Sequence, residues 1–260
     1  MKKTYQLKVI KKEVLNEEIF KFELEKPEDM PAIYPGQFFG LAASTNGYPL
    51  LKRPISVSKV LDKSIEFTVK VVGEGTKLLL NKEINDEIEV IGPVGNGFFL
   101  DEISEKSLIV GGGIGISPVK ELARYLKEEK DLRLPVVLGF RDKPFDMDDF
   151  SSISDEIEIA TESGVEGHKG YVTYILEERL KKGSVDQVLV CGPHMMLKAV
   201  KELCERYNVI TQLLMEERMA CGIGACLVCT CAIKEEGGVK NKRVCKDGPV
   251  FYGSEVVFDV

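Results

Sequence analysis

The sequence predicts an α+β multidomain protein with an antiparallel β-barrel, a parallel α/β domain and a small C-terminal module rich in cysteine. Short β-type runs fill the first hundred residues, and strands alternate with amphipathic helices over the next hundred. Five of the seven cysteines lie between residues 221 and 245. A chain of 260 residues is long enough for two domains and a small module. We place the three parts at residues 1–102, 103–211 and 212–260.

The barrel is predicted from six short runs of β-forming residues in the first part. They are residues 4–10, 19–24, 37–43, 55–61, 64–72 and 86–92. Turn signals such as Pro35-Gly36 and Gly92-Pro93 separate them. Several short strands at spacings of about 8–12 residues favour an antiparallel barrel or sandwich.

The second part alternates predicted strands with predicted helices. The strands are residues 107–112, 134–140, 156–161 and 187–192, and the helices are residues 117–130, 171–182 and 194–207. In the first helix, Val119, Leu122 and Leu126 lie on one face with charged residues opposite. Pro118 suits the first helical turn, where its missing N–H costs nothing. This alternation predicts a parallel sheet.

Charge and the N-terminal residues narrow the class of protein. Thirty-five basic and 42 acidic residues give a formal charge of −7, whereas nucleic-acid and anionic-membrane binding need a basic face. Residues 1–18 lack the apolar core of a signal peptide, and no run approaches the roughly 18 apolar residues of a membrane span. We therefore expect a cytoplasmic protein that binds neither nucleic acid nor membrane, with cysteines that hold metal or do redox chemistry.

The spacing of the clustered cysteines predicts a metal centre. Cys221 is followed by Cys226 after four residues, Cys229 after two more, and Cys245 after fifteen. Three close thiolates and one distant thiolate match the ligand arrangement of a plant-type [2Fe–2S] cluster. A four-cysteine zinc site is the alternative, but such sites usually contain two C-x2-C pairs and this segment has one.

Other residues near this motif have separate interpretations. Gly222 and Gly224 let the loop turn and bring backbone N–H groups toward the sulfurs. Cys231 is interpreted as a non-ligand, because using it instead of Cys229 would change the spacing to four and four. Cys204 lies in a predicted helix and is expected to be a buried small hydrophobe.

Two loops of the second part are candidates for binding a ligand that carries phosphate. The first contains four glycines, Gly111, Gly112, Gly113 and Gly115, between a strand and a helix. Such a loop lets a phosphate approach the backbone and the free N–H groups of the helix. It departs from the strict dinucleotide fingerprint at Ile116, and a tight turn without a ligand is the alternative.

The second loop is Cys191-Gly192-Pro193, which follows another predicted strand. Loops at the carboxyl ends of parallel strands line one crevice, where open α/β sheets bind ligands. His194, in the same loop, is expected to be structural or a phosphate contact, and His168 to be exposed. The pair Arg141 and Asp142 leaves NAD and NADP both open, since Arg suits a 2′-phosphate and Asp a ribose hydroxyl.

The barrel carries two candidate phosphate-binding segments. Arg53 begins a predicted strand, and Lys70 lies seventeen residues further on. Both cations can bind a pyrophosphate, the arginine through its bidentate fork. Gly75 and Thr76 can add backbone and hydroxyl contacts. Each segment alone is also compatible with a surface cation or a solvated turn.

Together these motifs resemble the ferredoxin–NADP reductase superfamily over essentially the whole chain. Residues 35–38, 53–56, 73–76 and 92–98 resemble its flavin domain, and residues 111–119 and 191–196 its nicotinamide domain. Residues 217–231 and 243–251 resemble the C-terminal [2Fe–2S] segment of one branch, the electron-transfer subunits of type B dihydroorotate dehydrogenase. Four cysteines at the cluster positions favour this branch over its sister, the small subunit of NADH-dependent ferredoxin:NADP oxidoreductase.

The resemblance implies where the cofactors bind. FAD is placed at Arg53, Pro54, Ile55, Ser56, Thr68, Val69, Lys70, Gly75 and Thr76. NAD(H) is placed at Gly111, Gly112, Gly113, Gly115, Cys191, Gly192 and Pro193, and the cluster at Cys221, Cys226, Cys229 and Cys245. Ile55 stands where the superfamily commonly has an aromatic residue, so ring stacking on the flavin is not implied there.

The implied function is electron transfer between these cofactors, without a catalytic acid or base. Nicotinamide gives two electrons as hydride and the cluster accepts one at a time, while flavin does both. The implied partner is an FMN-containing dihydroorotate dehydrogenase catalytic subunit, in a heterotetramer of two copies of each chain, which oxidises dihydroorotate to orotate with NAD for pyrimidine biosynthesis. Alternatives are a reductase subunit of another complex, of ferredoxin:NADP oxidoreductase or hydrogenase type, and a zinc-binding regulatory module.

Overall fold

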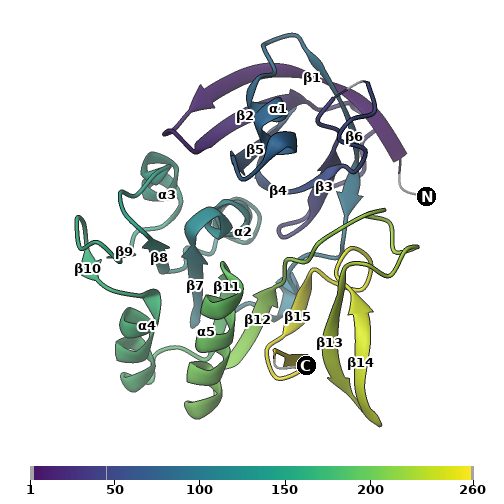
Figure 1. Ribbon diagram of the computed structural model, residues 1–260. Helices are drawn as coiled ribbons and strands as arrows, with labels where there is room; N and C mark the ends of the chain where they lie inside the picture. Colours follow the sequence, from purple (N-terminus) through teal and green to yellow (C-terminus); the bar gives the residue numbers. More distant parts are fainter. Residues whose placement is uncertain (1–2, 45, 259–260) are drawn as a thin grey trace.

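Figure 1 shows the computed structural model, in which residues 3–44 and 46–258 are described. The barrel lies at the top, the helices and the main sheet lie below it, and the C-terminal segment lies at the lower right. This architecture confirms the predicted combination of an antiparallel barrel, a parallel α/β domain and a small C-terminal module.

Six antiparallel strands close the barrel in the order β1-β2-β5-β4-β3-β6. Their bounds are β1 (Lys3–Val14), β2 (Ile19–Glu25), β3 (Phe38–Leu41), β4 (Arg53–Val60), β5 (Ser64–Lys70) and β6 (Glu87–Val94). Buried phenylalanines fill the interior, and Phe22 and Phe39 both pack on the ring of Phe67. Closure leaves no unpaired strand edge, which a small antiparallel domain needs in water.

One helix of the barrel was not predicted from the sequence. The Gly73–Thr76 segment, interpreted as a possible turn, instead forms the N-cap and first turn of α1 (Glu74–Leu80). The Thr76 hydroxyl accepts hydrogen bonds from the N–H groups of Val72 and Gly73 and so fixes the first turn. A helix of seven residues is too short for hydrophobic periodicity to reveal it.

The main sheet has seven strands in the order β10-β9-β8-β7-β11-β12-β15. The parallel strands are β7 (Ser107–Gly112), β8 (Val136–Phe140), β9 (Ile157–Thr161), β10 (His168–Lys169), β11 (Gln187–Cys191) and β12 (Ile210–Leu214). The helices are α2 (Ile116–Lys130), α3 (Met147–Ile153), α4 (Val172–Lys181) and α5 (His194–Arg206), and two single 3-10 turns are η1 (Leu100–Glu102) and η2 (Gly113–Gly115). The predicted parallel sheet is therefore confirmed.

Helix α2 lies between the barrel and the sheet (Figure 1). Its predicted apolar face is buried, since Val119, Leu122 and Leu126 all lie in the core of the α/β domain. The opposite face carries charges, as expected, but Lys120 and Glu121 on it are buried as well. Because β4 packs against that side of α2, the barrel excludes water from these charges.

The C-terminal segment shares its packing with the α/β domain. Strands β13 (Thr230–Glu235), β14 (Gly238–Arg243) and β16 (Val256–Val257) form a separate small sheet. Strand β15 (Val250–Tyr252) instead pairs antiparallel with β12. The boundary predicted between residues 211 and 212 falls within β12. A segment this short buries too little surface for a core of its own, so it uses the edge of the larger sheet.

Candidate functional site

A cavity of about 310 Å³ opens between the barrel and the α/β domain. Every residue that the sequence analysis assigned to FAD lines it, except Gly75. The α/β domain contributes Ile114 from η2 and Ser117 and Pro118 from the start of α2, and the C-terminal segment adds Met219 and Pro249. All three parts of the chain therefore meet at this cavity.

Two hydroxyl groups in the walls of the cavity have no hydrogen-bond partner among the described residues. Thr68 Oγ1 comes from β5 and Ser117 Oγ from α2, and the two residues are only 3% and 2% exposed. A buried hydroxyl without a partner costs free energy. Their position fits a polar ligand with hydrogen-bonding groups, such as a flavin, and they are a reason to place FAD in this cavity.

The side chain of Arg53 is seated directly against the first turn of α1. A Cβ atom added to Gly75 would lie 2.1 Å from Arg53 Nη1, so only glycine allows this close approach. Lys70 also lines the cavity, but its ammonium group lies 3.1 Å from Glu18 Oε2. Thr76 donates its hydroxyl proton to the Gly73 carbonyl at 3.0 Å, so this hydroxyl already stabilises the turn.

The two predicted nicotinamide loops touch each other. Strands β7 and β11 are neighbours, with Gly111 opposite Cys191 in the register. A Cβ atom on Gly115 would lie 2.7 Å from the carbonyl of Cys191, and one on Gly112 would lie 2.2 Å from Met196 Sδ. The glycines are therefore needed for the close packing of these two loops.

The thiol of Cys191, in the second of these loops, is fully buried. Burial, together with the nearby Glu216 carboxylate, raises the pKa of Cys191 well above its ordinary value. This thiol is therefore protonated at neutral pH. His194, in the same loop, begins α5 and packs edge-on against Phe258 at 4.8 Å between ring centroids.

Glu216 and Ser117 are site residues that the sequence analysis missed. Glu216 follows β12, lines the cavity and is exposed. The surrounding protein raises the pKa of this carboxyl by desolvation. Its place at the carboxyl end of a strand was the signal that could have revealed it, because open α/β sheets bind ligands at those ends.

The four predicted cluster cysteines come together in two pairs. The thiol of Cys221 interacts with that of Cys226, and the thiol of Cys229 interacts with that of Cys245. Gly222 and Gly224 both have positive φ, at 67° and 83°, which lets the loop fold around the sulfurs.

The pKa values of these thiols depend on their surroundings. Burial opposes ionisation of Cys221, but hydrogen bonds from the backbone N–H groups of Ile223, Cys226 and Ala225 lower its pKa to about 6. Burial, together with the neighbouring Cys229, raises the pKa of Cys245 to about 12. The loop thus directs backbone donors at the sulfur of Cys221.

The remaining cysteines are buried. Cys204 lies on α5 in the core, which confirms its predicted role as a small hydrophobe. Cys231 lies on β13 with its side chain buried on the same face as Ile233. Burial raises the pKa of Cys231 to about 12.

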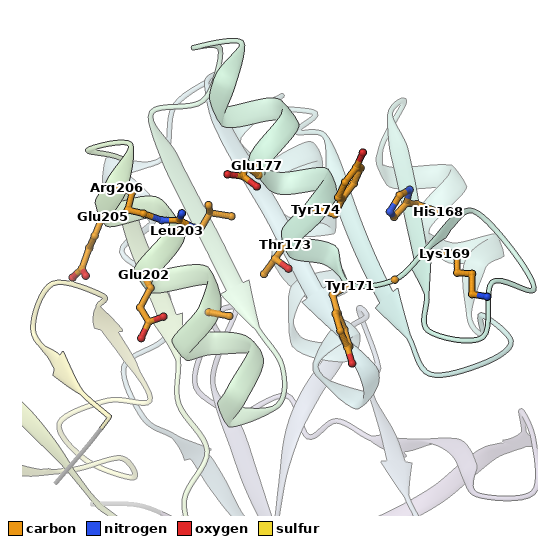
Figure 2. Close-up of a pocket in the computed structure, with 12 residues that line it drawn as sticks. His168, Lys169, Tyr171, Thr173, Tyr174, Glu177, Glu202, Leu203, Glu205 and Arg206 are labelled. Carbon is orange, nitrogen blue, oxygen red and sulfur yellow. The ribbon is translucent and has the colours of Figure 1, made fainter.

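A second and larger cavity, of about 910 Å³, lies between α4 and α5. Figure 2 shows His168 and Tyr174 on one side of it and Glu202 and Arg206 on the other. His168 belongs to the short strand β10 rather than to an exposed loop, and its ring stacks on Tyr174 at 4.2 Å. No residue predicted to bind a cofactor lines this cavity, so its size does not make it the functional site.

The two residues that could distinguish NAD from NADP, Arg141 and Asp142, lie just after β8. Asp142 accepts a hydrogen bond from the Ser163 hydroxyl at 3.0 Å, and Arg141 beside it is exposed.

No helix within the described residues combines the length and apolar character needed to cross a membrane.

Comparison with protein families identifies the class of protein. Residues 5–99 match the oxidoreductase FAD-binding domain, and residues 109–202 match the oxidoreductase NAD-binding domain. Residues 216–257 match the iron–sulfur cluster binding domain of dihydroorotate dehydrogenase B. With the cavity and the cysteine loop, these matches define an oxidoreductase with FAD, NAD and iron–sulfur binding domains.

Individual relatives narrow the class to a family. The electron transfer subunit of dihydroorotate dehydrogenase B (NAD(+)) from Caldanaerobacter subterraneus subsp. tengcongensis is 44% identical over 86% of this chain and 87% of its own length. The subunit of the same name from Geobacillus sp. is 39% identical over 99% of this chain and 100% of its own length. The chain belongs to the family of dihydroorotate dehydrogenase B electron transfer subunits.

Solved structures agree with this fold. A chain of the NADH-dependent reduced ferredoxin–NADP oxidoreductase has a TM-score of 0.85 and 30% identity, covering 100% of this chain and 92% of that one. The ferredoxin reductase of carbazole 1,9a-dioxygenase has a TM-score of 0.68 and 22% identity over 80% of this chain and 67% of its own. The second likeness concerns the fold alone.

Proposed function

We propose that this protein passes electrons between NAD(H), FAD and a [2Fe–2S] cluster, to and from an FMN-containing dihydroorotate dehydrogenase catalytic subunit. In the biosynthetic direction the partner oxidises dihydroorotate to orotate, and the electrons reach NAD through this chain. The family supports the activity, and the meeting of all three parts of the chain at one cavity supports the electron path.

The observation that carries the proposal is the short route from the flavin cavity to the cysteine loop. A third, small cavity adjoins the cavity proposed for FAD, and Phe38, Pro54 and Met219 line both. Cys221 and Gly222 line the far side of the small cavity. A flavin seated against Pro54 therefore lies one layer of side chains from a cluster ligand.

We propose specific residues for each cofactor. FAD is held by Arg53, Pro54, Ile55, Ser56, Thr68, Val69, Lys70, Gly75 and Thr76, with Ser117 added from the structure. NAD(H) is held by Gly111, Gly112, Gly113, Gly115, Cys191, Gly192 and Pro193. The cluster is held by Cys221, Cys226, Cys229 and Cys245.

The pairing of the cysteines supports a two-iron cluster over a zinc ion. Zinc bound by four cysteines at about 2.3 Å brings all four sulfurs within about 4 Å of one another. Within the described residues, only one group of three or more acidic, His or Cys side chains has its ligand atoms within 4.8 Å of one another. That group consists of three carboxylates, and the four thiols do not form such a group. Two separated pairs suit two irons, each bound by two cysteines.

The chain's own residues supply position and electrostatics rather than acid–base catalysis. Bound FAD would accept two electrons as one hydride and release them one at a time. Arg53 neutralises the phosphates, the glycine loops let the nicotinamide approach, and the buried Cys191 stays neutral.

The partner is proposed to dock on the cysteine loop. Ile223, Leu227 and Val228 expose apolar side chains beside the exposed Cys226. Apolar residues around a redox centre suit a subunit interface that excludes water and shortens the electron path. We further propose a cytoplasmic heterotetramer of two copies of each chain.

Anaerobic purification from the native cell tests the proposal. We expect flavin bands and broad iron–sulfur absorbance in the visible spectrum, reduction of both by NADH, and co-purification of an FMN-containing subunit that oxidises dihydroorotate. A colourless protein with zinc and no iron would contradict the redox function. Co-purification of a different flavoprotein that reduces ferredoxin or NADP would overturn the proposed partner.

A further inference from the structure

A buried network of six charged side chains joins the barrel to the α/β domain, outside both cofactor sites. Lys21, Lys59 and Glu66 come from the barrel, and Lys120, Asp146 and Asp149 come from the other domain. Lys120 is at its centre and only 2% exposed. Its ammonium nitrogen lies 2.8 Å from Glu66 Oε1 and 3.0 Å from Asp149 Oδ2, and it also hydrogen-bonds to Asp146.

The three carboxylates resemble a metal site but surround a lysine instead. Oxygens of Glu66, Asp146 and Asp149 all lie within 4.8 Å of one another. The Lys120 ammonium group bonds to all three carboxylates and takes the place that a cation would occupy. Burial alone would lower the pKa of Lys120, but the carboxylates raise it above its ordinary value. The lysine therefore stays charged and holds the three acids together.

Two further ion pairs cross the domain boundary around this centre. Lys21 on β2 lies 2.8 Å from Asp146 Oδ1, and Lys59 on β4 lies 3.2 Å from Asp149 Oδ1. These six side chains carry three positive and three negative charges, and the exposed Glu13 adds a fourth carboxylate 3.5 Å from Lys21 Nζ. Breaking a buried pair is costly because it leaves an uncompensated charge, so such a network favours one relative placement of the two domains.

Glu121, the residue after Lys120, attaches α2 to the barrel a second time. Glu121 is fully buried and accepts a hydrogen bond from the N–H of Val60 on β4 at 2.9 Å. Arg124 holds the same carboxylate with two hydrogen bonds of 2.7 Å. Two consecutive side chains of α2 therefore contact adjacent strands of the barrel.

These attachments lie next to both cofactor sites in the sequence. Lys120 is five residues after Gly115 of the nicotinamide loop, and Glu66 is two residues before Thr68 of the flavin cavity. Val60 is four residues after Ser56 on the same strand. The network therefore couples the first turns of α2 to the two strands that line the flavin cavity.

We propose that Lys120 is a positioning residue that fixes the distance between the bound nicotinamide and the flavin. The inference rests on the proposed function, because it assumes that hydride passes between these two sites. Hydride transfer requires the donor and acceptor atoms in near contact, and a displacement of about 1 Å slows such reactions by about a hundredfold. Lys120 touches neither cofactor site and acts through the placement of α2.

The test uses two variants of the full-length, cofactor-loaded protein. Lys120→Met removes the central charge, and Glu66→Gln removes the barrel carboxylate while Lys120 keeps its two partners on its own domain. Glu158→Gln is the matched control, since Glu158 pairs with Arg179 at 2.5 Å entirely within the α/β domain. Anaerobic stopped-flow measurement of flavin reduction separates the limiting rate from the dissociation constant of NADH.

A second readout needs no cofactor. In the apoprotein, hydrogen exchange of the Val60 amide reports whether α2 remains attached to β4. We expect both network variants to keep full FAD and iron content and to bind NADH within about twofold of wild type. We expect their limiting rate of flavin reduction to fall at least about tenfold and their Val60 amide to exchange faster, with the control unchanged.

Three outcomes would overturn the assignment. One is a wild-type limiting rate in Glu66→Gln together with accelerated Val60 exchange. Another is an equal loss of rate in Glu158→Gln. The third is loss of FAD or NADH binding in proportion to the rate, which would make the network merely structural. If the wild-type flavin is not reduced by NADH, the proposed function fails instead, and this result is distinct from the other three.

Discussion

The backbone N–H of Cys226 donates a hydrogen bond to Cys221 Sγ, at 3.4 Å between nitrogen and sulfur. This bond lies in a loop whose glycines have positive φ and whose other thiol pair is formed by Cys229 and Cys245. Hydrogen bonds to ligand sulfurs tune the reduction potential of an iron–sulfur cluster. A cluster bound through Cys221, as proposed above, would therefore receive this hydrogen bond at its ligand sulfur.

Replacing Cys221 with serine should abolish the cluster and spare the flavin. A serine oxygen is a poor substitute for a thiolate on iron, while the flavin cavity lies on the other side of Pro54. Iron content and the visible spectrum of anaerobically purified Cys221→Ser measure this. Cys231→Ala is the control and should retain iron, and loss of iron in Cys231→Ala would show that the ligands are wrongly assigned.

Removing the charge of Arg53 should weaken FAD binding and leave the iron content unchanged. Hydrogen bonds to a charged group contribute about 1.5–3 kcal/mol, so Arg53→Ala should lower the FAD affinity roughly 10- to 100-fold. Fluorescence titration of apoprotein with FAD measures the affinity. Arg133→Ala, at an exposed pair with Asp155, is the control and should bind FAD normally. Unchanged FAD affinity in Arg53→Ala would refute its proposed role.

Replacing Thr68 with valine should affect the apoprotein and the FAD-bound protein in opposite directions. The Thr68 hydroxyl is buried without a partner, so its removal should stabilise the apoprotein by about 1 kcal/mol. The same change should weaken FAD binding, because the flavin loses a hydrogen-bonding group. Thermal unfolding with and without FAD checks both effects.

A matched control for this experiment is Thr161→Val on β9. The Thr161 hydroxyl is also buried but donates to the carbonyl of Glu166 at 2.7 Å. Its removal should destabilise the apoprotein by about 1 kcal/mol, since the carbonyl loses its partner. Equal destabilisation by both changes would mean that the Thr68 hydroxyl already has a hydrogen-bond partner in the apoprotein.

Glu216 should make the apoprotein less stable as the pH rises. Its folded-state pKa is raised above the ordinary value of 4.5 by desolvation, so the folded state binds its proton more tightly than the unfolded state does. The free energy of unfolding should therefore fall as the pH rises from 4.5 through the folded-state pKa. In Glu216→Gln this contribution should disappear, giving a smaller loss of stability between pH 4.5 and neutral pH. An identical pH profile in both proteins would contradict the raised pKa.

A charge at Leu227 should weaken binding of the catalytic partner. Leu227 is 63% exposed beside Cys226, and a buried glutamate at an apolar interface should cost about 2 kcal/mol or more, roughly thirtyfold in affinity. Val239→Glu is the control, since Val239 is similarly exposed but pairs with Lys234 near the turn of the β13–β14 hairpin, at the end of β13 away from Cys229. Equal affinities of Leu227→Glu and wild type for the partner in a binding titration would show that the partner does not bind at Leu227.

Much of this fold could be predicted because its signals are local. The cysteine spacing, the glycines between β7 and α2, and the apolar face of α2 each lie within one short stretch of chain. Helix α1 escaped prediction because seven residues carry no periodicity, and the pairing of β15 with β12 escaped it because the partners lie some forty residues apart. Loop closure over such a distance leaves no local signal.

The sequence by itself determined the three parts of the chain and the residue types available for each cofactor. Spacing and composition depend only on chain order, and chain order is what a sequence contains. The tertiary structure alone decided that Thr68, Ser117 and Glu216 line one cavity, and that Lys120 binds the barrel through Glu66. These relationships join residues from different domains, and only packing, which excludes water and forces buried polar groups to find partners, brings them together.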